Sequence, residues 1–313
     1  METADLQALA KSTRNTREAG VALLLGSVVL TAFIFFPLTK NDLPAAPVAL
    51  VEHPDAFAEV PISAQAAIVY DLALGKVLYE KNADAQLPLA SLTKLLTTHT
   101  ALHELGPDAP ITITESDEAV DNPRRFAVGD TLALSDLARV TLTASLNDGA
   151  TAMARTAAER QGTTTEMLLA SAITALGLTS TYAMNGSGLD LSTHVSGAYG
   201  SARDVAILAG ELVALAPEVA LATTLPKASA RTEKGKTYEI LNTNPTVLYA
   251  PRLLLSKTGF TDLAGGNLTL VFDVGINHPI ALVVLNSTAE ARFTDAQALV
   301  AATLAHFAGV SSL

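Results

Sequence analysis

The sequence contains no cysteine and little charge. Of its 313 residues, 16% are charged and 49% are hydrophobic, and the formal net charge at pH 7 is −11. The absence of cysteine excludes disulfides, iron–sulfur clusters, thiolate zinc sites and cysteine nucleophiles. The negative net charge argues against a general nucleic-acid-binding surface. The length fits one large domain or two, and the hydrophobic content is ample for a sizeable core.

Three motifs of other chemistries are missing or incomplete. No G-x-S-x-G sequence occurs, which disfavours an α/β-hydrolase. His99 and His103 have the spacing of an H-E-x-x-H zinc site, but the glutamate of that motif is absent. Gly235-Lys236-Thr237 resembles the end of a P-loop, but Ala230 replaces its first glycine. We therefore expect no metal and no cofactor.

The N-terminal region has the pattern of a membrane anchor. Residues 1–18 are polar and include three basic residues, whereas residues 19–38 contain no charged residue. A helix of that length spans a hydrocarbon core of ~30 Å. A cleaved signal peptide is the alternative, but its apolar part is usually ~7–15 residues long and ends near an A-x-A site. The nearest such triplet, Ala56-Phe57-Ala58, lies well downstream. We expect an uncleaved transmembrane anchor at 19–38, with residues 1–18 in the cytoplasm.

The rest of the chain reads as a linker and one catalytic domain. Residues 39–57 are rich in Pro and Ala and predict a tether, and the domain is expected to cover 58–313. Two strand-like runs come first, then a long helical block, three more strand-like runs and a closing helix. We expect the strands to join in one antiparallel sheet with the helical block inserted, which is an α/β (α+β) fold. The predicted strands are 66–70, 76–79, 253–255, 267–274 and 280–285, and the predicted helices include 91–105 and 294–307.

The first candidate motif for catalysis opens the helix at 91–105. Ser91 and Lys94 are three residues apart and therefore lie on the same face of one helical turn. The first turn of a helix offers positive potential and free backbone N–H groups, which favour a serine nucleophile. Lys94 lies one turn deeper, where partial burial could remove its proton and make it a base.

The second candidate motif is Ser145-Leu146-Asn147, which lies between two predicted helices. The hydroxyl of Ser145 could relay a proton, and the amide of Asn147 could hold a substrate carbonyl. An ordinary helix N-cap at Asn147 or Asp148 is the competing interpretation.

The third candidate motif is Lys257-Thr258-Gly259, which is predicted to follow directly after a strand that ends at Ser256. On an edge strand it offers a cation, a hydroxyl and a glycine where a substrate backbone could lie alongside. Each of the three motifs is weak alone, but S-x-x-K, S-x-N and K-T-G occur once each and in this order. Together they are typical of the penicillin-recognising serine enzymes.

Over residues 60–310 the chain resembles the D-alanyl-D-alanine carboxypeptidases, the low-molecular-mass penicillin-binding proteins of serine peptidase family S11. The resemblance implies a β-lactamase/transpeptidase-like fold. It is carried by the following segments: the hairpin 67–82, Pro88-Leu89-Ala90-Ser91-Leu92-Thr93-Lys94, Leu176-Gly177-Leu178, Asn185-Gly186-Ser187-Gly188-Leu189, Ser201-Ala202-Arg203-Asp204, and Lys257-Thr258-Gly259-Phe260-Thr261 with Ala264-Gly265.

The resemblance also implies roles for individual residues. Ser91 would be the acylated nucleophile, Lys94 its general base, and Ser145 the group that passes a proton to the leaving amine. Asn147 would hold the acyl-side amide of the substrate. The remaining predicted site residues would bind substrate. Lys257, Thr258 and Arg292 would bind its terminal carboxylate, and Gly259 would lie beside its backbone. The backbone N–H groups of Phe260 and Ser91 would form the oxyanion hole.

The implied function is trimming of peptidoglycan stem peptides that end in D-Ala-D-Ala, with β-lactams as inhibitors. The implied location is the bacterial cell membrane, with a single pass and an extracytoplasmic catalytic domain. A DD-endopeptidase, a serine β-lactamase and a catalytically silent cell-wall-binding module remain alternatives. The complete set of two serines and two lysines argues against the silent module. The E-x-x-L-N loop of class A β-lactamases has only a partial match, Glu166-Met167-Leu168-Leu169 before Ala170.

Overall fold

The structure is a computed structural model that describes residues 11–21, 23–25, 55–117, 125–245 and 250–309. By its contacts the chain divides into two units, Met1–Glu52 and His53–Leu313. In the first unit, residues 11–21 and 23–25 are helical. The predicted membrane span at 19–38 lies mostly outside the described residues. Within the described part, no helix combines the length and the apolar character that crossing a membrane requires.

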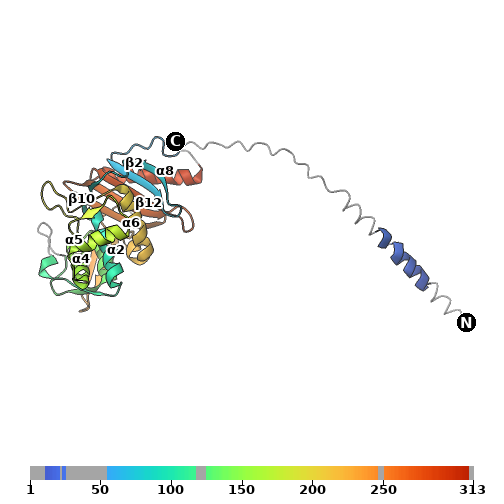
Figure 1. The fold of residues 1–313 in the computed structure, drawn as a ribbon, viewed down its shortest axis with the longest axis horizontal. Helices are drawn as coiled ribbons and strands as arrows, with labels where there is room; N and C mark the ends of the chain where they lie inside the picture. The colour runs from blue at the N-terminus through green and yellow to red at the C-terminus, as the bar shows by residue number, and fades with distance from the viewer. Residues whose placement is uncertain (1–10, 22, 26–54, 118–124, 246–249, 310–313) are drawn as a thin grey trace. The chain divides into compact units, whose positions relative to one another are not determined.

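The second unit is built on a five-stranded antiparallel sheet in the order β10-β11-β12-β1-β2 (Figure 1). Its strands are β1 (Ala66–Asp71), β2 (Lys76–Lys81), β10 (Leu253–Thr261), β11 (Gly265–Asp273) and β12 (Pro279–Ser287). Ala66 pairs with Leu285, so the first strand of the domain lies beside the last. The two predicted strand sets therefore do form one sheet, with the helical block inserted between them.

Helices cover both faces of this sheet. In Figure 1, β12 lies between α8 (Ala291–Ala308) and α6 (Ala202–Leu215). Successive side chains of a strand point to opposite faces, so a strand buried on both sides reads as a continuous apolar run. In β12, Leu282 and Val284 join the core beneath α8, whereas Val283 joins the core on the other face.

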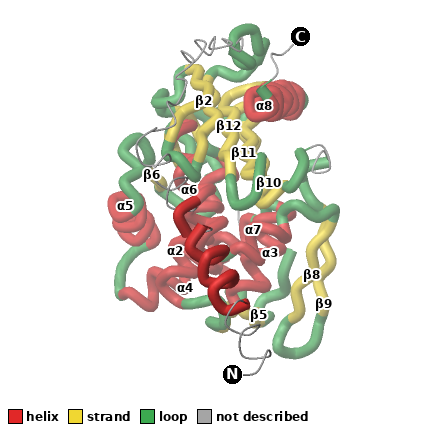
Figure 2. The backbone as a smooth tube through the Cα atoms, turned by 90° about the vertical axis from the view of Figure 1, so that its right-hand side faces the viewer, coloured by secondary structure: helices red, strands yellow, loops and turns green. Residues whose placement is uncertain are grey.

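The helical block supplies the elements that carry the first two motifs (Figure 2). These helices are α2 (Thr93–Leu105), α3 (Leu134–Ala144), α4 (Asn147–Gln161), α5 (Thr165–Ala175), α6 and α7 (Pro217–Ala222). Short strands link them, and the bounds of these strands are β3 (Leu87–Pro88), β4 (Pro110–Thr112), β5 (Thr131–Ala133), β6 (Tyr182–Ala183), β7 (Ala198–Gly200), β8 (Lys227–Arg231) and β9 (Thr237–Leu241).

The structure corrects one predicted strand end and shows one strand pair that was not predicted. The K-T-G motif lies inside β10, which continues to Thr261, and not after a strand that ends at Ser256. The P-loop-like stretch at Gly235 lies in the turn of the β8–β9 hairpin, where Gly235 has a φ of +85°. The hairpin packs against α3, and no strand had been predicted there. Glycine occupies that turn because it adopts positive φ at no steric cost.

Candidate active site

The nucleophile candidate lies in a tight turn before α2. Ser91 is the middle residue of a 3₁₀ turn, η1 (Ala90–Leu92), and Ala90 enters the turn with a φ of +48°. Ser91 is partly exposed, whereas Lys94 is fully buried. The Lys94 Nζ donates hydrogen bonds to Ser91 Oγ at 2.8 Å and to the carbonyl oxygen of Ser187 at 2.7 Å. The predicted contact between serine and lysine on one helical turn is present.

Burial lowers the pKa of Lys94 to about 7, against a smaller opposing effect of the Asp148 carboxylate. The physical cause is loss of water around the ammonium, which disfavours its charged form. A substantial fraction of Lys94 is therefore neutral near pH 7, with its amine at hydrogen-bond distance from the Ser91 hydroxyl. A neutral amine at hydrogen-bond distance can act as a general base.

The second motif begins in left-handed backbone. Ser145 ends α3 with a φ of +58°, and its Oγ accepts a hydrogen bond from Lys257 Nζ at 2.8 Å. Asn147 is the first residue of α4 and is 6% exposed. Leu146 is the N-cap residue, so neither Asn147 nor Asp148 occupies the N-cap position, and the Asp148 Oδ1 accepts the Gly149 N–H from within the first turn at 2.9 Å. The N-cap interpretation was therefore wrong. The Asn147 Oδ1 is buried without a hydrogen-bond partner in the described structure.

The third motif lies on β10, which is an edge strand of the five-stranded sheet. Lys257 is 1% exposed, and its Nζ donates to the carbonyl oxygen of Thr258 at 2.6 Å as well as to Ser145. Burial, and then repulsion from Lys94 and Arg292, lower the pKa of Lys257. Lys94 and Lys257 are therefore close enough to repel each other, although their motifs are far apart in the sequence.

Gly259 packs closely against the turn that carries Ser91. A Cβ at this position would lie 3.0 Å from the carbonyl oxygen of Leu89 and 3.4 Å from the Ala90 Cβ. The missing side chain therefore lets β10 approach the turn that carries Ser91. The side chain of Phe260 is 52% exposed.

Arg292 reaches the same strand from the start of α8. Its Nη1 donates to the carbonyl oxygen of Gly259 at 2.7 Å, and its guanidinium lies 4.7 Å from the centre of the Phe293 ring. Burial lowers the pKa of Arg292, and the buried Nε has no hydrogen-bond partner in the described structure. Arg292 thus belongs to the site by position, with donors left over.

Comparisons with known proteins place this geometry in a family. A family model described as D-alanyl-D-alanine carboxypeptidase, peptidase family S11, matches residues 52–289. The chain belongs to that family. It is accordingly a serine-type peptidase of the D-Ala-D-Ala carboxypeptidase class, which confirms the predicted family and enzyme class.

Individual relatives agree with this assignment. The D-alanyl-D-alanine endopeptidase of Pseudomonas aeruginosa is 32% identical over 295 residues, which cover 91% of this chain and 87% of that protein. The D-alanyl-D-alanine carboxypeptidase DacC of Escherichia coli is 32% identical over 269 residues, which cover 79% of this chain and 64% of that protein. Penicillin-binding protein D2 of Listeria monocytogenes, in a cefotaxime-bound crystal structure, superposes with a TM-score of 0.65 at 29% identity, over 78% of this chain and 98% of that chain. The predicted transpeptidase-like fold is thus confirmed.

In this carboxypeptidase-family site, one supporting loop was not assigned a role from sequence. The carbonyl of Ser187, which holds Lys94, belongs to a loop that Asn185 organises by accepting from the Gly188 N–H at 2.7 Å and from the Ser187 N–H at 3.2 Å. Gly188 has a φ of +75°, and a Cβ there would lie 1.9 Å from the Ala90 carbonyl oxygen. Only the glycines in this stretch gave a sequence signal for such close packing.

A second support comes from Asn267 on β11, which is fully buried. Its Nδ2 donates to the carbonyl oxygens of Pro88 at 3.0 Å and Leu89 at 3.1 Å, and its Oδ1 accepts from the Asn286 N–H at 2.8 Å. The amide thereby ties the segment before Ser91 to the sheet. Sequence reasoning missed this role because the partners are backbone atoms.

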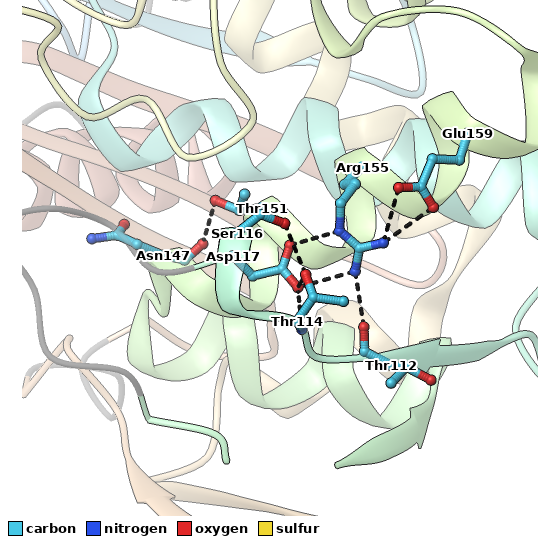
Figure 3. Close-up of polar contacts among 8 residues, drawn as sticks. All are labelled: Thr112, Thr114, Ser116, Asp117, Asn147, Thr151, Arg155 and Glu159. Atoms are coloured by element: carbon cyan, nitrogen blue, oxygen red, sulfur yellow. Dashed lines mark hydrogen bonds and ion pairs between the residues drawn. The ribbon is translucent and has the colours of Figure 1, made fainter. Parts of the chain in front are cut away.

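The helix that begins at Asn147 is anchored along one face (Figure 3). Thr151 donates to the carbonyl oxygen of Asn147 at 3.0 Å. One helical turn further on, Arg155 forms a two-pronged ion pair with the fully buried Asp117, with distances of 2.8 and 3.0 Å, and it also contacts Glu159. In Figure 3 the side-chain amide of Asn147 points away from this network. The network thus holds α4 while leaving that amide free of the other labelled side chains.

Proposed function

We propose that the protein is a D-Ala-D-Ala carboxypeptidase that trims peptidoglycan stem peptides through an acyl-enzyme on Ser91. The observation that carries this proposal is the buried Lys94 amine at 2.8 Å from the Ser91 hydroxyl. A serine hydroxyl at its ordinary pKa is a weak nucleophile and needs an adjacent base. A lysine with a pKa of about 7 can supply that base at physiological pH.

In the acylation step, Lys94 accepts the Ser91 proton while Ser91 Oγ attacks the carbonyl carbon of the penultimate D-alanine. The backbone N–H groups of Ser91 and Phe260 stabilise the resulting oxyanion. Ser145 then donates its hydroxyl proton to the amine of the departing D-alanine as the peptide bond breaks, and it receives in exchange the proton that Lys94 took from Ser91, so Lys94 is neutral again. Water hydrolyses the ester and regenerates Ser91. The 2.8 Å contact between Lys257 and Ser145 supports the position of Ser145 as the relay.

Substrate recognition uses the remaining groups. The unpartnered Asn147 Oδ1 is suited to accept an N–H from the acyl side of the peptide. Lys257, Thr258 and Arg292 form the site for the terminal carboxylate. A bound carboxylate would raise the pKa of Lys257, because an opposite charge favours the ammonium form. The substrate would thereby restore the charge that burial disfavours in the free enzyme.

β-Lactams should acylate Ser91 as well, since the lactam carbonyl and carboxylate match the same groups. Fluorescent penicillin should label the wild type and a Ser229→Ala control, whose serine is exposed on β8, and should not label Ser91→Ala. Intact mass measured minutes after mixing should show one stable adduct. Labelling of Ser91→Ala would overturn the assignment of the nucleophile. Rapid release of excess hydrolysed penicillin would indicate a β-lactamase.

A DD-endopeptidase is the second candidate, and the name of the Pseudomonas relative, 87% of which is covered, favours it. Cleavage of cross-links passes through the same kind of acyl-enzyme. Digestion of purified muropeptides separates the two activities. We expect release of free D-alanine from pentapeptides. Loss of cross-linked dimers with pentapeptides intact would assign the enzyme as an endopeptidase.

We also propose that residues 19–38 anchor the protein in the bacterial membrane and that the catalytic domain lies outside the cytoplasm. The uncharged run and the basic residues before it support this topology. Protease added to intact spheroplasts should digest the domain. Full protection of the domain would refute the topology.

A further inference from the structure

A threonine outside the three motifs contacts the carboxylate site. The Thr243 Oγ1 lies 2.6 Å from the Thr258 Oγ1, at a distance where either hydroxyl can donate. The Thr243 backbone N–H donates to the carbonyl oxygen of Thr143 at 3.1 Å, two residues before Ser145. Thr243 therefore bridges the chain that leads into the second motif and the side chain of the third.

The chain around Thr243 is firmly held. The Asn242 Nδ2 donates to the carbonyl oxygens of Thr223 at 2.7 Å and Leu225 at 2.8 Å. The Asn244 Nδ2 donates to Ser256 Oγ on β10 at 2.7 Å. Thr243 is exposed, whereas Thr258 is 5% exposed. The segment therefore presents one hydroxyl to the edge strand at a fixed position.

The direction of the hydrogen bond between Thr243 and Thr258 decides whether Thr258 has a proton left for the substrate. A hydroxyl has one proton to donate and two lone pairs that accept. If Thr258 donates to Thr243, it has no proton left for a substrate carboxylate. If Thr243 donates instead, Thr258 can donate to the carboxylate, and the two hydrogen bonds polarise each other. The competing acceptor for the Thr243 proton, the Thr143 carbonyl oxygen, is 3.4 Å away, so that bond is weak.

We propose that Thr243 is a positioning residue for carboxylate recognition: its hydroxyl donates to Thr258 and thereby directs the Thr258 proton to the carboxylate terminus of the substrate. The inference rests on the proposed function, in which Thr258 binds that carboxylate. It predicts a role in binding and not in proton transfer at Ser91.

The test compares Thr243→Val, which keeps the volume but loses the hydroxyl, with Thr243→Ser, which keeps the hydroxyl. Thr243→Val should raise KM for a D-Ala-D-Ala peptide about three- to tenfold with kcat unchanged, as expected for one lost hydrogen bond. Thr243→Ser should have the same KM as the wild type, because it keeps the hydroxyl. A peptide with a C-terminal amide should show no difference between wild type and Thr243→Val. Thr224→Val, in which the lost hydroxyl donates to the carbonyl oxygen of Leu221, is the matched control.

Two outcomes would overturn the inference: an unchanged KM in Thr243→Val and Thr243→Ala, or an equal loss on the amide peptide. Thr243→Ala serves as the second variant, and unchanged thermal midpoints would show that the variants are folded. Failure of the proposed function looks different, because the wild type itself would then release no D-alanine.

Discussion

The acylation rate should follow the titration of Lys94. With a pKa of about 7, roughly half of the Lys94 side chains are neutral at pH 7. A lysine with the ordinary pKa of ~10.4 would be neutral in only roughly 0.04% of molecules at that pH. Burial therefore supplies about a thousandfold more base at neutral pH. The rate of acylation by penicillin should rise about tenfold per pH unit below pH 7 and level off above pH 8.

Asp148 provides the perturbation that tests the electrostatic part of this argument. Its buried carboxylate raises the pKa of Lys94, and it accepts the N–H groups of Arg125 at 2.6 Å and Phe126 at 3.0 Å. In Asp148→Asn the midpoint of the acylation profile should shift to lower pH, because the ammonium loses a favourable partner. Asp136→Asn, which alters a surface pair with Arg139, should leave the midpoint in place.

Stopped-flow measurement of acylation by a fluorescent penicillin between pH 5.5 and 9 provides both profiles. A lower plateau with the same midpoint in Asp148→Asn would show that the variant only loosens the site. A flat profile in the wild type, or a rate that still rises about tenfold per pH unit up to pH 9, would refute the assignment of Lys94 as a base with a pKa of about 7.

Three further outcomes concern stability. The pKa of Lys94 is lower in the folded than in the unfolded chain, so the free energy of unfolding of the wild type should rise with pH between about 7 and 10.4. Lys94→Met lacks this titration. Measured by denaturant unfolding, its free energy of unfolding minus that of the wild type should therefore be about 2 kcal/mol larger at pH 7 than at pH 9. Gly188→Ala should abolish penicillin labelling or folding because its Cβ would collide with backbone, whereas Gly162→Ala, at a φ of +63° in open space, should cost only about 1 kcal/mol and keep labelling. Arg155→Ala should lower the free energy of unfolding by about 3–5 kcal/mol, because it leaves the buried Asp117 carboxylate without its ion-pair partner. Glu159→Ala, which removes an exposed partner, should lower it by less than about 1 kcal/mol. Equal losses in that last pair would contradict the argument.

The parts of the fold that the sequence predicted well carry local signals. The β1–β2 hairpin has strand-like runs around a turn that ends in Gly75, and α2 follows directly from the S-x-x-K pattern. The end of β10 was misplaced because Gly259 is typical of a turn and is depleted in strands, whereas its pairing with Asn267 on β11 keeps it in the strand. Tertiary pairing of this kind overrides local propensity.

The site shows the same division. Ser91, Lys94 and Lys257 could be found because their side chains carry the chemistry and their spacing forms motifs. The roles of the Ser187 carbonyl and of the Asn267 contacts could not be found in this way. Both depend on backbone carbonyl acceptors, which every residue type has. Thr243 lies in a segment without a predicted element, and only the fold brings its hydroxyl to Thr258.

The pairing of β1 with β12 also determines when the enzyme can become active. Ala66 must find Leu285, so the central sheet cannot close until nearly the whole domain has been synthesised. Contacts between distant parts of a chain form slowly, because a long loop must first be closed. Until then the hairpin that precedes Ser91 exposes an unpaired strand edge, which can recruit other strands. A chain that stops before β12 should therefore aggregate and bind no penicillin, which gel filtration and labelling of such a truncation would measure.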